Sequence, residues 1–299
     1  MFKTVRLYLS EIKFAHTVFA MPFAVAGAAL AFSEAAAARD GRPAPLFVAE
    51  KLALIIAATV GARSAAMMFN RLADVRYDAA NPRTARRAVV TGAISKPAAW
   101  GFVGCMCAVF IIAAALLNTL SLALSPLALV VVLGYSLTKR FTPLTHFFLG
   151  LALALAPMGA WIGVLGSLAS FEIPALMAGA VLLWTAGFDI IYACRDYRVD
   201  AASALHSIPK SIGIEKALYL SAVLHAAAVL LLISLLAVSP SLGLIFAFGV
   251  VAIAALLFFE HMIVRPNDLS RINTAFFTIN GIVSAVLLVC VILDVLLPC

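Results

Sequence analysis

The chain has 299 residues, of which 65% are hydrophobic and only 12% are charged, about half the charged share of a typical soluble domain. A water-soluble protein of this length would lack the polar side chains needed to cover its surface, so the composition excludes an ordinary cytosolic enzyme and predicts an integral membrane protein. The 21 basic and 14 acidic residues give a net charge of +7, which in an apolar chain bears first on orientation in the lipid bilayer.

Nine apolar windows follow one another along the chain, each near the roughly 20 residues that a helix needs to cross a bilayer core about 30 Å thick. They lie at residues 14–33, 46–69, 98–119, 122–138, 144–166, 173–195, 215–237, 241–260 and 275–297. No small-residue cleavage site follows the first window, so we expect it to remain in the mature protein rather than to act as a signal peptide. The expected fold class is therefore all-α, an integral membrane bundle of nine transmembrane helices that forms a single domain over residues 1–299.

The Lys and Arg residues are concentrated in alternate loops between these windows. With the N-terminus placed inside, 17 of the 21 lie on the inner side, and the exceptions are Arg39, Arg42, Lys51 and Arg63. Inner loops of membrane proteins are enriched in positive charge, so the pattern predicts a cytoplasmic N-terminus and an outer C-terminus. The charge excess is then explained by topology, and no nucleic-acid partner is expected.

The inner end of the second predicted helix carries a regularly spaced set of polar residues. Arg63, Asn70, Asp74 and Asp78 are separated by steps of seven, four and four residues, which keep them on one helical face. Because carboxylates four residues apart repel one another, we expect a cation between them.

The inner end of the sixth predicted helix repeats this pattern. Asp189, Asp196 and Asp200 are separated by seven and four residues, again on one helical face. Mg²⁺ prefers oxygen ligands and is usually shared between one or two carboxylates and substrate phosphates. Two acidic helix ends on the same side of the membrane therefore predict a diphosphate site bridged by magnesium. The alternative is that both are solvated helix ends paired with neighbouring arginines.

Cations suited to a diphosphate lie between the fourth and fifth predicted helices. Tyr135 and Lys139 are one helical turn apart, and Arg140 follows directly. Lysine offers phosphate a point charge, whereas arginine offers a bidentate fork to phosphate or carboxylate. The loop at residues 81–87 is basic as well. For both segments, anchoring of a loop on the positive inner side is an equally good interpretation.

The motifs, in this order and on this topology, resemble those of the UbiA superfamily of intramembrane prenyltransferases. Residues 70–78 are similar to its first aspartate motif, residues 189–200 to its second, and residues 135–139 to its Y-x-x-x-K motif. The resemblance covers essentially the whole chain, and it implies the nine-helix plan of that family.

The resemblance also implies a reaction, a cofactor and site residues. The reaction is transfer of a polyprenyl group from a polyprenyl diphosphate to a small aromatic acceptor, with Mg²⁺ as the cofactor. The residues implied to hold Mg²⁺ and diphosphate are Asn70, Asp74, Asp78, Asp189, Asp196 and Asp200. Those implied to contact substrate are Arg63 and Lys139 on phosphate oxygens, Arg140 on the acid group of the acceptor, and Tyr135 and Tyr192. The residues implied to be catalytic are Asp74, Asp78, Asp196, Asp200 and Lys139.

The expected role is prenylation of a 4-hydroxybenzoate-type acceptor in ubiquinone or menaquinone biosynthesis, in a bacterial cytoplasmic membrane with the active site facing the cytoplasm. Arg71 stands where many ubiquinone-pathway members carry aspartate, and residues 205–209 and 273–280 look more like members associated with menaquinone synthesis by the futalosine route. A futalosine-derived, haem-type or chlorophyll-type acceptor is therefore a further alternative.

A secondary transporter is the alternative from another class, because intramembrane acids also serve as ion relays. No obligate protein partner is expected. Among the isolated polar residues, His16, His146 and His225 are expected to be packing residues, and the sequence identifies no partner for Glu260 or Asp294.

Overall fold

The structure is a computed structural model that describes residues 2–12, 20–38, 41, 43–197 and 204–297. These residues are largely helical and contain no β-strand, which confirms the all-α prediction. In chain order the elements are α1 (Phe2–Glu11), α2 (Met21–Ala38), α3 (Pro45–Ala80), α4 (Ala88–Thr91), α5 (Lys96–Leu117), α6 (Thr119–Thr138), α7 (Thr145–Leu165), α8 (Glu172–Ala193), η2 (Cys194–Asp196), α10 (Ile208–Ile212), α11 (Ile214–Val238), α12 (Leu244–Ile263), η3 (Thr274–Ile279) and α13 (Asn280–Leu296).

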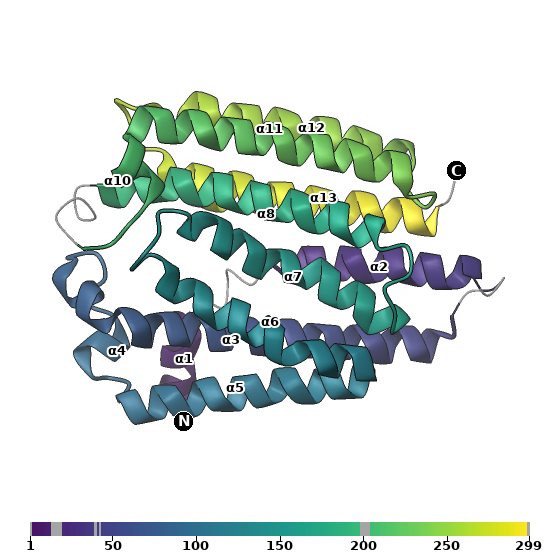
Figure 1. The fold of residues 1–299 in the computed structure, drawn as a ribbon, viewed down its shortest axis with the longest axis horizontal. Coiled ribbons are helices and arrows are strands. Elements are labelled where there is room, and N and C mark those ends of the chain that lie inside the picture. Colours follow the sequence, from purple (N-terminus) through teal and green to yellow (C-terminus); the bar gives the residue numbers. More distant parts are fainter. Residues whose placement is uncertain (1, 13–19, 39–40, 42, 198–203, 298–299) are drawn as a thin grey trace.

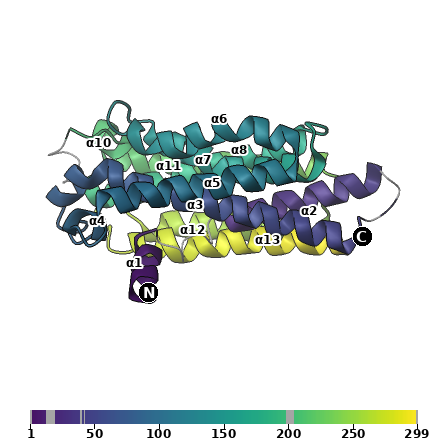
Figure 2. The same cartoon turned by 90° about the horizontal axis from the view of Figure 1, so that it is seen from below.

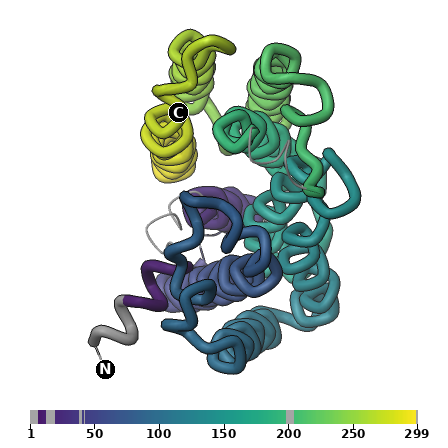
Figure 3. Tube along the Cα trace, turned by 90° about the vertical axis from the view of Figure 1, so that its left-hand side faces the viewer, coloured from purple at the N-terminus to yellow at the C-terminus, as the bar shows by residue number. Residues whose placement is uncertain are grey.

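The long helices run side by side along one axis, as Figures 1 and 3 show. Helix α3 packs against α5 and α6, helix α7 packs against α2, α6 and α8, and α8 packs against α11. Helix α13 closes the other side of the bundle against α2 and α12. The short helices α4 and α10 lie at the same end of the bundle, whereas α1 runs across its long axis (Figure 2).

Eight helical segments of the described part are long and apolar enough to cross a membrane. They are Pro45–Ala80, Lys96–Leu117, Thr119–Thr138, Thr145–Leu165, Glu172–Asp196, Ile214–Val238, Leu244–Ile263 and Thr274–Leu296. Helix α2 is apolar but shorter, and residues 14–19 of the first predicted window lie outside the described residues. Every predicted window overlaps an observed helix, while the count of nine crossings and the inward N-terminus stay predictions.

Helix α3 is the longest element, with 36 residues, or about 54 Å at 1.5 Å per residue. This length exceeds the roughly 30 Å thickness of a bilayer core. The apolar part of α3 can therefore span the bilayer while its polar end carries Asn70, Asp74 and Asp78 towards the membrane surface.

Glycines allow the central helices to approach closely, as small residues do in other membrane bundles. A Cβ atom at Gly150 of α7 would lie only 2.4 Å from the carbonyl oxygen of Leu182 in α8. A Cβ atom at Gly27 of α2 would lie 2.7 Å from the carbonyl oxygen of Pro157 in α7. Helices α2, α7 and α8 can pack at this spacing because neither position carries a side chain.

Asp294 has the partner that the sequence did not reveal. Its Oδ2 atom accepts hydrogen bonds from the backbone N–H groups of Gly243 and Phe246, both at 2.8 Å. These groups lie at the N-terminus of α12, where backbone donors have no partner within the helix. Asp294 of α13 therefore caps α12 from a neighbouring helix.

A buried polar network joins α8, α12 and α13. Asn280 accepts a hydrogen bond from the indole N–H of Trp184 at 2.7 Å, and its amide donates to Glu260 at 2.8 Å and to the carbonyl oxygen of Ala275 at 3.0 Å. The bond to Ala275 lies in η3, a π-helix that carries Phe276 to the cavity described below. Glu260, which the sequence left without a partner, is thus bound inside the bundle.

Candidate functional site

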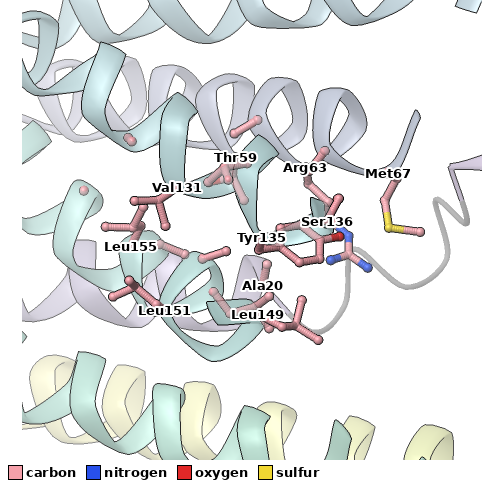
Figure 4. A pocket seen from close by; sticks show the side chains of 18 of the residues that line it. Ala20, Thr59, Arg63, Met67, Val131, Tyr135, Ser136, Leu149, Leu151 and Leu155 are labelled. Atoms are coloured by element: carbon pink, nitrogen blue, oxygen red, sulfur yellow. The ribbon is translucent and has the colours of Figure 1, made fainter. Parts of the chain in front are cut away.

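A cavity of about 800 Å³ lies between α3, α5, α6, α7 and α8. Most of its wall is apolar, with side chains such as Ile55, Leu124, Val131 and Leu155. Figure 4 shows aliphatic side chains of α6 and α7, such as Val131 and Leu155, around the cavity, with Arg63 and Tyr135 projecting towards one another. The cavity can therefore hold a long apolar group beside a few polar ones.

The first aspartate motif lies at the polar end of α3, with its members on one face as predicted. Asn70 lines the cavity. Asp74 is only 2% exposed and accepts a hydrogen bond from the Nζ atom of Lys139. Asp78 is paired with Arg87 through Oδ2 and Nη1. Thus each carboxylate of this motif is paired with a cation from outside α3, Asp78 with one in the loop that follows and Asp74 with one 65 residues away.

The second motif begins on α8 and continues beyond its end. Asp189 and Asp196 both line the cavity, as does Tyr192. The prediction of one continuous helical face is wrong in part, because α8 ends at Ala193 and the chain continues as the 3₁₀-helix η2. A 3₁₀ turn is common at the end of an α-helix, and it changes the angular position of Asp196. Asp200 lies outside the described residues.

Arg83 joins the two motifs. It follows the first motif in the loop after α3, and its Nε and Nη2 atoms donate to the carboxylate of Asp196 at 3.2 and 2.6 Å. Its guanidinium carbon lies 5.8 Å from the ring centroid of Tyr192. Burial alone would lower the pKa of Arg83, but the charge of Asp196 and this hydrogen bonding raise it above its usual value. The two acidic segments therefore lie at the same end of the bundle and face one another.

The Y-x-x-x-K pair lies at the C-terminal end of α6, with Lys139 directly after the last residue of the helix. Tyr135 and Lys139 both line the cavity, together with Arg63 from α3. Arg140 does not line it. Instead, Nη2 of Arg140 donates to the backbone oxygen of Ala73 at 2.6 Å. Three of the predicted side chains, Arg63, Tyr135 and Lys139, therefore line the same cavity. Arg140 is instead bound to the backbone of α3.

His146 is a site residue that sequence reasoning assigned to packing. Its Nδ1 atom lies 2.7 Å from Oδ2 of Asp189, and its Nε2 atom accepts from the backbone N–H of Ile208 at 3.3 Å. Because Nε2 accepts, Nδ1 is the nitrogen that donates to Asp189. No sequence spacing links residues 146 and 189, so only the packing of α7 against α8 reveals this pair.

Three buried polar atoms, two on cavity-lining residues and one on Asp74 beside Lys139, have no hydrogen-bond partner in the described part of the chain: Arg63 Nε, Ser136 Oγ and Asp74 Oδ1. Such atoms are costly unless something else satisfies them. The two aspartate motifs offer carboxylate and amide oxygens, which are the ligands that a hard cation prefers. Among the described residues no three His, Cys, Asp or Glu side chains are close enough to hold a metal ion by themselves. A magnesium ion would thus need further oxygen ligands, which substrate phosphates provide.

Comparison with known proteins gives a family and a fold. Residues 20–282 match the model of the UbiA prenyltransferase family. A structure of a UbiA homolog from Aeropyrum pernix K1 is 36% identical in sequence and has a TM-score of 0.82, with 94% of this chain and 98% of that chain covered. A UbiA homolog from Archaeoglobus fulgidus, solved bound to GPP and Mg²⁺, has a TM-score of 0.70 at 20% identity, with coverage of 96% and 99%.

Among curated proteins, a 4-hydroxybenzoate octaprenyltransferase of Neisseria gonorrhoeae is 35% identical over 152 residues. The match covers 50% of this chain, and the chain spans about half, 51%, of the length of that relative.

Proposed function

The chain belongs to the UbiA prenyltransferase family, and from this premise we propose that it transfers a polyprenyl group from a polyprenyl diphosphate to an aromatic acceptor of the 4-hydroxybenzoate type. The observation that carries the proposal is the cavity, whose apolar walls end at two facing acidic segments with their own basic partners. The apolar part is suited to an isoprenoid chain and the polar end to its diphosphate. The names of the similar proteins support the same substrates, because one prenylates 4-hydroxybenzoate and another was solved with GPP and Mg²⁺.

We assign the binding of magnesium diphosphate to the oxygens of the two motifs, namely Asn70, Asp74, Asp78, Asp189, Asp196 and Asp200. The unpartnered Oδ1 atom of Asp74 supports a cation at this place. Bound magnesium supplies positive charge that stabilises the departing diphosphate. Lys139 lies at the same end of the cavity and is suited to a phosphate oxygen.

In the reaction, the C–O bond between the prenyl group and its diphosphate breaks, a bond forms between the prenyl carbon and a ring carbon of the acceptor, and the ring loses a proton. The cationic side chains stabilise the negative charge that develops on the leaving group. Breaking of the C–O bond leaves an allylic cation on the prenyl group. The apolar wall excludes water from this cation until the acceptor attacks it. The carboxylates therefore act by holding cations rather than as general acids or bases.

Arg63 contacts an anionic group of a substrate deep in the cavity. It lines the cavity, and its buried Nε atom has no hydrogen-bond partner among the described residues. A buried donor without a partner is costly, so a phosphate or carboxylate of the substrate would relieve it. The predicted contact of Arg140 with the acid group of the acceptor has weaker support, because Arg140 is bound to Ala73.

The reaction belongs to respiratory quinone biosynthesis, either of ubiquinone or of menaquinone, in a bacterial cytoplasmic membrane. The polar end of the cavity faces the cytoplasm, as the basic loops around it support. A futalosine-derived acceptor is the alternative within this reaction class.

The test is incubation of purified protein in lipid nanodiscs with Mg²⁺, several prenyl diphosphates and a panel of aromatic acceptors, followed by mass spectrometry of the adduct. Asp74→Asn and Asp196→Asn should reduce adduct formation strongly, as should removal of Mg²⁺ with EDTA. The matched control is Asp268→Asn, because Asp268 is exposed in the loop after α12 and its side chain accepts a local hydrogen bond from the backbone N–H of Ser270.

The proposal fails if no pair of substrates gives an adduct, or if Asp74→Asn is as active as the control. A transporter would instead move a substrate across sealed vesicles without consuming any diphosphate.

A further inference from the structure

Helix α1 is docked on the end of the bundle that carries the first motif. It runs across α3 rather than along it (Figures 1 and 2). The ring of Tyr8 packs on that of Phe102 in α5, with centroids 5.1 Å apart. Ile12, directly after α1, is buried in one apolar cluster with Met68 of α3 and Val89 of α4. Apolar contacts therefore hold the end of α1 against three other helices.

Glu11, the last residue of α1, is only 9% exposed, and its Oε1 atom accepts the backbone N–H of Ala88 at 2.7 Å. Ala88 is the first residue of α4, and it directly follows Arg87, which is paired with Asp78 of the first motif. The carboxylate of Glu11 thus fixes the backbone one residue away from Arg87, the cation that is paired with Asp78.

Glu11 makes a second contact, with Arg71. The Nε atom of Arg71 lies 4.0 Å from Oε2 of Glu11 and donates to the carbonyl oxygen of Glu11 at 3.4 Å. Arg71 is 6% exposed, and a buried arginine needs a counterion. Its Nη1 atom donates to Oδ1 of Asn70 at 3.4 Å. Arg71 is the residue at which the first motif departs from the family pattern, and Glu11 supplies the carboxylate that this arginine requires.

We propose that Glu11 is a positioning residue for the prenyl diphosphate. Glu11 acts on Arg87 through the backbone of Ala88, and on Asn70 through Arg71. The inference rests on the proposed function, since it concerns the same site. Glu11 does not line the cavity, so it acts without contact to substrate.

The need for such an anchor follows from the ion pairs around it. Arg83 and Arg87 hold the loop after α3 in place through Asp196 and Asp78. When a diphosphate takes over these arginines, both ion pairs are weakened, and the loop loses two of its attachments. The bond from Glu11 to Ala88 involves no group that binds substrate, so it persists and keeps the loop over the site.

The kinetic test compares Glu11→Ala, Glu11→Gln and Tyr8→Leu. Outer residues that orient ligands of a site typically alter affinity or activity by about 10–100-fold, and we expect the KM for prenyl diphosphate to rise by about that much in Glu11→Ala. The KM for the acceptor should change little. Glu11→Gln should show a smaller rise, because its amide oxygen still accepts from Ala88. Tyr8→Leu keeps both contacts of Glu11 and should resemble the wild type.

Limited digestion with trypsin gives a readout that does not depend on catalysis. Arg86 is exposed in the loop after α3, and cleavage there should be faster in Glu11→Ala than in the wild type or Tyr8→Leu. If the wild type forms no adduct, the proposed function fails, while this digestion still tests the anchoring of the loop.

The inference is overturned if Glu11→Ala changes neither the KM for prenyl diphosphate nor the cleavage at Arg86, or if Tyr8→Leu changes both as much. An equal rise in the KM for both substrates also overturns it. If the alanine variant does not fold, Glu11→Gln against Tyr8→Leu decides by the same criteria.

Discussion

Replacement of Asn280 by leucine tests the buried network behind the cavity. Asn280 is fully buried and makes three hydrogen bonds, from the indole of Trp184 and to Glu260 and the carbonyl oxygen of Ala275. Leucine has a similar size but makes none of them. The variant therefore leaves one donor and two acceptors without their partner, in a region that water does not reach.

The expected loss of stability follows from these three bonds. Side-chain hydrogen bonds inside membrane proteins average about 0.6 kcal/mol each, which gives about 2 kcal/mol for the three. A buried group left without a partner costs about 1–3 kcal/mol in soluble proteins. The upper limit of the expected loss of stability is therefore higher than the sum of the three bonds. Because Glu260 is fully buried and its Oε2 atom has no hydrogen-bond partner among the described residues, we expect a loss of about 2–5 kcal/mol.

The assay is unfolding of the purified protein in detergent micelles, followed by circular dichroism. Ser234→Ala is the control, because Ser234 is exposed and bonds only to Leu230 of its own helix; its effect should stay within about 0.5 kcal/mol. Glu260→Gln should be far milder than Asn280→Leu, since a glutamine oxygen can still accept from Asn280. A stability of Asn280→Leu equal to that of the control would refute the reasoning.

Three other substitutions test packing, capping and orientation. Gly150→Ala should lower the thermal midpoint, because its Cβ would lie 2.4 Å from Leu182 O, and overpacking of this kind costs about 1–3 kcal/mol. Asp294→Ala should destabilise by about 1 kcal/mol, the usual value of a lost helix cap, while Asp294→Asn should retain most of the stability in the same melts. His146→Leu should reduce prenyl transfer about 10–100-fold, as loss of residues that orient ligands does, and should also destabilise by about 1–3 kcal/mol, because the buried N–H of Ile208 loses its acceptor; full activity would show that Asp189 needs no such support.

The helices could be predicted from the sequence because the bilayer imposes their length. Each predicted window overlaps an observed helix, because an apolar run of about 20 residues is the length that a helix needs to cross the bilayer core. The ends were less predictable: α8 changes to a 3₁₀-helix before Asp196, and nothing in the apolar pattern marks that change. Asp294 likewise looked isolated, because its partners lie about fifty residues away, at Gly243 and Phe246.

The candidate site was predictable in its acids but not in their partners. Spacing alone placed Asp74 and Asp78 on one face. The sequence predicted a cation between these carboxylates and left pairing with neighbouring arginines as the alternative, whereas the structure pairs Asp74 with Lys139 and Asp78 with Arg87. Asp74 and Lys139 lie on segments that meet only after folding. The carboxylate and histidine pair of Asp189 and His146 was hidden for the same reason.

The pairing of each acid with a base has a consequence for how the site can work. Unpaired charges at the edge of an apolar bundle are costly, so Asp74 and Asp196 hold Lys139 and Arg83 in the structure. Magnesium diphosphate carries both signs of charge. Its cation can replace the basic side chains on the carboxylates while its phosphates bind those side chains, so Asp74, Asp196, Lys139 and Arg83 would have partners before and after binding. Either ion alone would leave one set unpaired, so we expect these residues to favour the combined ligand over each of its components.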